Sequence, residues 1–249
     1  MNKFLKRLVD HSKKEDKSGR FLKNGLVEIL LVKAGILLAL AIYSWYVEYQ
    51  EKLKIKEYFT SISQEIKPAI PIAKDKAKQT DSLIIKTVRC LEILNSKNID
   101  SLPYLKTNLG PLVWVNSQEF SFPAVTELLN GSYIEKVKNK ETIALLRELK
   151  QQLSIINDNH DYSTNRYLLA IEPFTNKYLN YTEVALPTKQ SLLVQGGPKT
   201  NYEALFENMV LWNLLSQKLE GYKSQVIRQE NLGKLLKALS ENLESQIND

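Results

Sequence analysis

The sequence predicts an all-α protein in which a single N-terminal transmembrane helix continues into an extracytoplasmic antiparallel helical bundle with long helices. Three observations predict this fold class. Residues 26–47 form one apolar run of membrane-spanning length, apolar residues recur every three or four positions over most of the remaining chain, and segments with strand character are too short to build a sheet. Glycine and proline are sparse, at 9 and 8 of the 249 residues, which also favours helices.

Residues 24–47 are expected to cross a lipid bilayer as one helix. A hydrocarbon core of about 30 Å needs about 20 apolar residues at about 1.5 Å rise each, so the uncharged stretch at 34–47 is too short alone. The span therefore takes in Glu28 and Lys33, whose charges cost less near an end of the helix than at the bilayer centre. Trp45 lies among three tyrosines, as in an interfacial aromatic belt at the far end.

Two other interpretations of this run stay open. A buried helix of a soluble cytosolic protein would suit the two charges, but it does not suit an uncharged run with basic residues on one side and aromatic residues on the other. A cleavable signal peptide fits less well than a signal-anchor, because the preceding basic segment is long and no small-x-small cleavage site follows the run.

Basic residues are concentrated before this helix. Residues 1–23 hold eight Lys or Arg and three Asp or Glu, a net charge of +5, whereas the whole chain carries +6. By the positive-inside rule, we expect this segment to be cytoplasmic and residues 48–249 to be periplasmic, on a bacterial inner membrane. Nucleic acid is not an expected partner, because the charge is confined to one end, next to an apolar helix.

The rest of the chain is expected to form helices separated by proline- and glycine-containing connections. In chain order these are a continuation of the spanning helix over 48–66, a helix over 72–94, a connection over 95–116, a short helix over 122–129, a long helix over 141–178, a loop over 186–200 and a last helix over 202–247. Pro68 and Pro71 should stop or kink the first helix, and Pro173 should bend or interrupt the long one. Ser121 is the expected N-cap of the short helix. A polar gap at Gln229 and Glu230 interrupts the apolar line of the last helix.

Few residues point to catalysis or to a metal, and no cofactor is expected. The chain has two histidines, and His11 should lie on the other side of the membrane from His160. His160 beside Asp158 and Asp161 would serve as a general base or a single ligand, but a zinc site needs three or four ligands. A histidine on the apolar line of a helix is more often a hydrogen-bonded core residue, which is the favoured interpretation.

Two further features are best explained without a functional role. Residues 196–200 (GGPKT) lack the first glycine of the phosphate loop G-x-x-x-x-G-K-[ST], and Pro198 has no N–H to offer a phosphate, so a loop-to-helix turn is favoured. Cys90 is the single cysteine, so no intrachain disulfide is possible, and a packed, inert thiol is favoured.

The membrane segment holds the candidate interface and helix-association residues, which are Glu28, Lys33, Gly35, Ala39 and Trp45. Gly35 and Ala39 form a small-x-x-x-small pair that would let two spanning helices approach. Because the pair is common by chance, a homo-oligomer and another envelope protein both stay open as partners beside the lipid bilayer. Glu28 would bind a partner helix or carry a proton, although an interfacial carboxylate among lysines is preferred.

Residues 27–32 (VEILLV) and 35–40 (GILLAL), followed by Trp45, match a recurring pattern of Glu-Ile, an aliphatic run, Gly-Ile-Leu-x-Ala-Leu and Trp. This segment resembles an uncharacterised Bacteroidota family of single-pass membrane-anchored proteins, a domain of unknown function. Residues 124–149 give a looser match to the middle of that family. The resemblance implies topology and helical architecture, not an activity. It makes Glu28 an expected feature and Lys33, which stands for an aliphatic residue, a departure.

These observations favour a membrane-anchored, non-catalytic helical protein of the bacterial envelope that serves as a scaffold, an interaction module or a signal-transmitting module. The alternative is an envelope hydrolase or lipid-handling enzyme with its site in the loops at 95–121 and 186–200. A deep polar cleft with converging carboxylates would favour the enzyme, whereas fully packed apolar stripes would count against it.

Overall fold

The computed structural model describes residues 3–116 and 118–248, with side chains for 27–116, 118–186 and 188–248. Within these residues the secondary structure is helical, without strands, which confirms the all-α prediction. The chain divides into two compact units, an N-terminal unit, Met1–Lys54, and a C-terminal unit, Ile55–Asp249. The side chains of the basic segment at 1–23, including His11, lie outside the described residues, so its expected role stays a prediction.

The described residues of the N-terminal unit belong to one helix, α1 (Lys3–Ile66), which also supplies the first residues of the C-terminal unit. Every residue from 27 to 46 is exposed, and Leu31 and Leu37 expose about two thirds of their surface (68% and 67%). By length and composition this helix is apolar enough to cross a membrane, and none of its most apolar stretch is buried. A core helix of a soluble protein would bury such a stretch.

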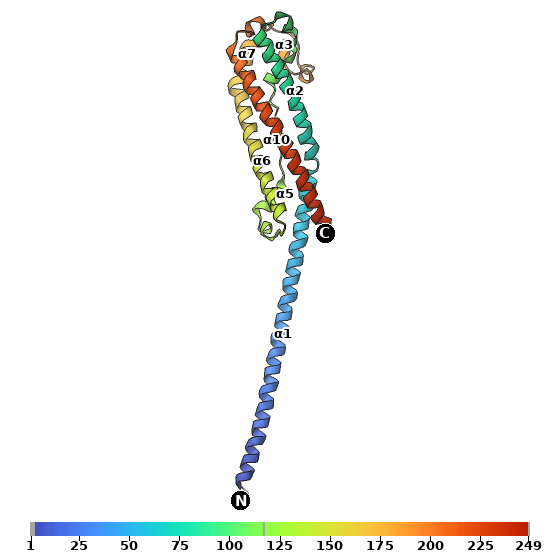
Figure 1. The fold of residues 1–249 in the computed structure, drawn as a ribbon, viewed down its shortest axis with the longest axis vertical. Coiled ribbons are helices and arrows are strands. Elements are labelled where there is room, and N and C mark those ends of the chain that lie inside the picture. Colours follow the sequence, from blue (N-terminus) through green and yellow to red (C-terminus); the bar gives the residue numbers. More distant parts are fainter. Residues whose placement is uncertain (1–2, 117, 249) are drawn as a thin grey trace. The chain divides into compact units, whose positions relative to one another are not determined.

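Three long helices of the C-terminal unit pack side by side: α2 (Ala69–Ser96), α6 (Lys140–Arg166) and α10 (Met209–Asn248). Helix α10 contacts both of the others and runs in the opposite direction to them (Figure 1). Shorter helical segments connect and cover them. These are η1 (Ile99–Ser101), α3 (Leu102–Asn108), α4 (Gly110–Val113), α5 (Pro123–Asn130), η2 (Ser132–Lys136), η3 (Tyr167–Ile171), α7 (Glu172–Tyr178), α8 (Tyr181–Val184), α9 (Pro187–Gln190) and η4 (Glu203–Leu205).

Several helix boundaries follow the sequence signals. The first helix ends at Ile66 and the next begins at Ala69, so Pro68 separates them as predicted. Helix α6 begins one residue before Glu141, because the Asn139 side chain accepts the Glu141 backbone N–H at 2.9 Å. Before Pro173 the chain changes to a π-helical turn at Tyr167–Ile171, since proline supplies no N–H to the regular helical pattern.

Other boundaries differ from the prediction. The connection at 95–116 is mostly helical, since its prolines occupy the first turns of α3 and α4, where no N–H is needed. Ser121 does not cap α5. The N-cap position is Phe122, and both Glu65 carboxylate oxygens accept the Ala124 backbone N–H at 3.1 Å. The last helix begins at Met209 instead of 202, because the Asn208 side chain accepts the N–H of Leu211 at 3.0 Å.

The buried apolar residues of the C-terminal unit form two clusters. The first cluster includes the end of α1 and the following buried residues of α6 and α10: Leu146, Leu149, Ile156, Leu232, Leu235, Leu236, Leu239 and Leu243. The second cluster includes Cys90, Leu105, Leu109, Leu112, Ile171, Phe174, Leu211 and Leu215. Along α10, a mainly polar stretch lies between the residues of the second cluster and those of the first, and on α6 a polar stretch follows the first-cluster residues and ends before η3, which belongs to the second cluster. These stretches position the candidate site.

Candidate functional site

The five candidate residues of the membrane segment lie on the exposed part of α1. These are Glu28, Lys33, Gly35, Ala39 and Trp45. A Cβ added to Gly35 would meet no atom within 4 Å, so one copy of the chain leaves this helix face open. The rings of Trp45 and Tyr49 stack with their centroids 6.2 Å apart. Apart from this ring contact within α1, no contact in the described chain assigns these residues a partner, so their roles stay predictions.

The C-terminal unit contains a polar cavity of about 110 Å³, which we call the cationic cavity. It is lined by α6 between Ile156 and Arg166, by α10 between Gln217 and Gln229, and by Asn116 and Gln118 from the segment before α5. On α10 this lining lies between the residues of the second cluster and those of the first, and on α6 it runs from Ile156, a first-cluster residue, to the end of the helix. The polar gap seen in the sequence at Gln229 is thus one edge of a cavity.

Three basic side chains of this lining have no acidic partner. Arg166, Lys218 and Arg228 form no ion pair with any carboxylate in the part of the chain whose side chains are described. The described lining residues include no Asp or Glu. Lys218 Nζ donates to the carbonyl oxygen of Trp114 at 2.7 Å. Burial, with the nearby Arg166 charge, lowers the pKa of Lys218 to about 8, and burial also lowers the pKa of Arg228.

His160 lies in the lining of the cavity and not within an apolar cluster, which corrects the favoured sequence interpretation. Its Nε2 lies 3.1 Å from Glu119 Oε1. Its Nδ1 is buried without a partner. Asp158 and Asp161 are exposed and do not line the cavity, so the acidic neighbour of His160 comes from another segment.

The cavity also has a second unpaired polar atom, on Gln229, and an open position at Gly221. Gln229 is 2% exposed, and its Oε1 has no hydrogen-bond partner. An unpaired buried polar atom costs about 1–3 kcal/mol, so native structures hold few of them. Gly221 lines the same cavity in the middle of α10, where a Cβ would meet no atom within 4 Å. A glycine inside a helix also costs about 0.5–1 kcal/mol relative to alanine.

The lining offers positive charge and hydrogen-bond donors, which is the chemistry of anion binding. Ser163 lies one turn from His160, but the unpaired Nδ1 means that no serine–histidine hydrogen bond is formed. A glycosidase needs two carboxylates about 5–9.5 Å apart, and the described lining residues include none. No group of three or more His, Cys, Asp or Glu in the described chain is placed to hold a metal ion.

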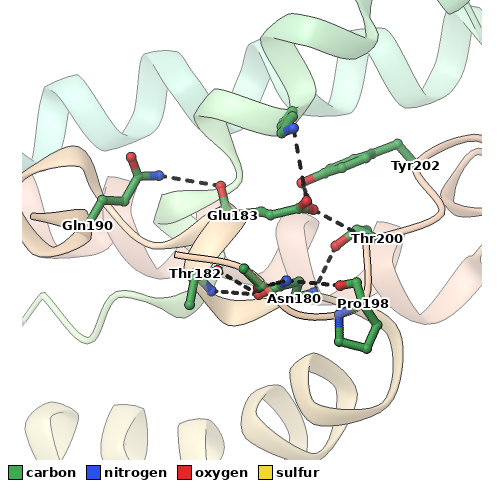
Figure 2. A network of polar contacts seen from close by, with 9 residues as sticks. Asn180, Thr182, Glu183, Gln190, Pro198, Thr200 and Tyr202 are labelled. Carbon is green, nitrogen blue, oxygen red and sulfur yellow. Dashed lines mark hydrogen bonds and ion pairs between the residues drawn. The ribbon is translucent and has the colours of Figure 1, made fainter. Parts of the chain in front are cut away.

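The loop at 186–200 is held by an internal polar network at another place in the unit (Figure 2). The Asn180 side chain donates to the carbonyl oxygens of Gly196 and Pro198 at 2.8 and 2.9 Å. The Glu183 carboxylate accepts the backbone N–H of Thr200 and the hydroxyl of Tyr202, both at 3.2 Å.

This network explains the GGPKT segment without a phosphate. Gly196 and Gly197 have φ of 135° and 89°, the left-handed region that favours glycine, as a turn requires. Burial raises the pKa of Glu183, but the hydrogen bonds from Thr200 and Tyr202 outweigh it and hold that pKa below its ordinary value. An internal carboxylate therefore takes the N–H group that a phosphate loop would offer to a ligand.

We expect the Cys90 thiol to be unreactive in the folded protein. Cys90 is fully buried, and its Sγ donates to the carbonyl oxygen of Asn108 at 3.3 Å. Burial raises its pKa to about 12, against the opposing charge of Lys86, so almost no thiolate exists near neutral pH. A thiol-reactive chromogen added at neutral pH should label one thiol per chain in denaturant and almost none in buffer. Rapid labelling of the folded chain would contradict this burial.

We expect Lys218 to make the folded state more stable at alkaline pH. The folded pKa is about 8 and the reference value is 10.5, so between them the unfolded chain binds more protons and the free energy of unfolding rises with pH. Relative to a Lys218→Met variant, the wild type should gain about 1–3 kcal/mol over this interval. Urea denaturation at several pH values measures the gain, and parallel pH profiles for the two proteins would refute it.

Comparison of the chain with protein-family models, with curated proteins and with solved structures gives no match. The class of protein is therefore defined by the fold and the site alone: an all-α protein with an exposed apolar helix and a separate helical unit that holds a cationic cavity.

Proposed function

We propose that this protein is a single-pass, membrane-anchored and non-catalytic helical protein of a bacterial envelope. Its C-terminal unit acts as a periplasmic antiparallel bundle that binds a partner. The proposal rests on the exposure of every residue from 27 to 46, in a helix whose most apolar 18 residues have a mean hydropathy of 2.0 and are not buried. Exposed apolar surface of this extent marks a membrane or protein interface, and the length suits a bilayer.

The +5 charge of residues 1–23 supports an N-terminus in the cytoplasm and a C-terminal unit in the periplasm. The hydrolase alternative is less well supported, because the loop at 186–200 is held by its own contacts and the cavity beside the loop at 95–121 has no carboxylate among its described lining residues. Polar groups of the loop at 186–200 already form hydrogen bonds with Asn180 and Glu183.

Alkaline carbonate extraction of membranes that contain the tagged full chain tests the anchor. The chain should stay in the pellet with integral proteins, and its recovery in the supernatant would refute the anchor. Protease added to intact spheroplasts tests the orientation: it should digest the C-terminal unit and leave a protected N-terminal fragment. Crosslinking in cells then tests the interaction role, which fails if neither a second copy nor another envelope protein is captured.

A further inference from the structure

We infer that the cationic cavity binds a phosphate-type oxyanion that keeps at least one P–O–H group, either free inorganic phosphate or a phosphate monoester such as the headgroup of phosphatidic acid. This inference goes beyond membrane anchoring and does not depend on it. Four features of the cavity carry it: its charge, its volume, its unpaired acceptor atoms and the open position on α10.

Three basic side chains give the cavity its positive charge. Arg166 projects from α6, and Lys218 and Arg228 project from α10, so two helices bring positive charge to one cavity. Removing charges from water is costly unless they are paired, and no carboxylate of the described chain pairs with these three. A bound anion would offset part of this repulsion, because monohydrogen phosphate carries a charge of −2 and a singly protonated monoester a charge of −1, and the guanidinium groups suit phosphate oxygens in geometry.

The volume limits the ligand to a few heavy atoms. A dry cavity of about 150 Å³ holds one benzene molecule. The 110 Å³ of this cavity therefore admits a phosphate group with little beyond it. A larger ester would place only its phosphate inside and leave the remainder outside.

The unpaired atoms select among oxyanions. Gln229 Oε1 is a hydrogen-bond acceptor, and His160 Nδ1 is one as well when the imidazole is neutral with its proton on Nε2, the nitrogen that lies 3.1 Å from Glu119 Oε1. An anion with acceptor oxygens alone would leave both atoms unpaired. A monohydrogen phosphate or a singly protonated monoester has an O–H donor, whereas sulfate near neutral pH and a phosphodiester have none. A site that combines donors with an unpaired acceptor should thus prefer phosphate to sulfate, because unpaired groups are costly.

Calorimetric titration of the full-length chain in detergent micelles tests the inference. At about pH 6, where a monoester is half protonated, inorganic phosphate or dihexanoyl phosphatidic acid should bind saturably with one site per chain. Sodium sulfate should bind about tenfold more weakly or not at all. Saturation with phosphate alone assigns a free anion, and tighter saturation with the short-chain lipid assigns a headgroup. No saturable binding of either probe up to about 10 mM, or equal binding of phosphate and sulfate, would overturn the inference.

Two substitutions on α10 test whether phosphate binds in the cavity. Arg228→Gln should weaken phosphate binding at least about tenfold. Lys223→Gln removes the same charge from an exposed position of the same helix, outside the lining, and should leave binding unchanged. Equal loss in both variants would show non-specific charge attraction and overturn the site.

A third substitution decides the case if Arg228→Gln fails to fold. A side chain at Gly221 enters open space, so Gly221→Asp should place a carboxylate among the three cations without a clash. It should abolish phosphate binding and melt at a higher temperature than Gly221→Asn, which has the same shape without the charge. A Gly221→Asp chain that binds phosphate as the wild type does, or melts no higher than Gly221→Asn, would contradict an anion site.

Discussion

A chain in which Ile36 and Leu40 are both replaced by aspartate is expected to lose its membrane insertion. The two residues lie one helical turn apart, near the middle of residues 26–47, and expose 55% and 57% of their surface. A carboxylate at the centre of a spanning helix costs about 2.5–3.5 kcal/mol, and each aliphatic residue removed forfeits about 0.3–0.6 kcal/mol. Together the substitutions should disfavour insertion by about 6–8 kcal/mol. Carbonate extraction followed by ultracentrifugation measures the shift from pellet to supernatant.

The matched control replaces the same two residues with alanine, which removes apolar surface without adding charge. This double alanine variant should stay in the pellet. Residues 27–46 bury nothing in the folded chain, so neither change should alter the melting of the C-terminal unit. Retention of the double aspartate variant in the pellet would contradict a spanning helix and favour attachment through another surface.

Helix boundaries that depend on neighbouring residues could be predicted from the sequence. Pro68 ends a helix because its ring excludes regular hydrogen bonding, whatever the rest of the fold does. The start of α6 could be predicted for a similar reason, since its apolar spacing begins just after the Asn139 cap. These signals act over a few residues, so no knowledge of the tertiary structure is needed to use them.

Boundaries that depend on distant residues could not be predicted in this way. Ser121 has the side chain of a good cap, but Glu65, 59 residues away from Ala124, provides the carboxylate that caps α5. The apolar spacing alone predicts that the last helix begins at Tyr202. The tertiary structure instead places a separate 3₁₀ turn at Glu203–Leu205, and the Asn208 cap starts the helix afresh.

The cationic cavity likewise could not be predicted from local sequence signals. The polar gap at Gln229 is visible in the sequence, and Gly221 in the middle of a long helix is a second signal, which the apolar spacing did not take into account. Neither signal indicated that α6 would bring Arg166 and His160 to the same place, because the register between two helices is fixed only when they pack. His160 was therefore assigned to a core, and its partner Glu119 was missed.

Substitutions in either of the two hydrophobic clusters are expected to destabilise the C-terminal unit strongly. Leu211 lies in the second cluster and Leu239 in the first, both are fully buried, and both belong to α10. Each single Leu→Ala change should lower the free energy of unfolding by about 2–5 kcal/mol, through lost apolar contact and the space left behind. Leu169→Ala, at a position that is 80% exposed, is the control and should change it by less than about 0.5 kcal/mol.

The double variant shows whether the polar layer divides the unit. The two leucines are 28 residues apart on one helix, or about 42 Å, so their direct contributions should add to within about 0.5 kcal/mol. Since α10 is continuous through both clusters, we expect urea denaturation to give one transition that each single variant shifts and the double variant shifts further. Two transitions, each moved by only one of the substitutions, would mean that the polar residues around the cavity separate the clusters into independently unfolding parts. In that case a ligand in the cavity would be expected to join them, and phosphate would merge the two transitions.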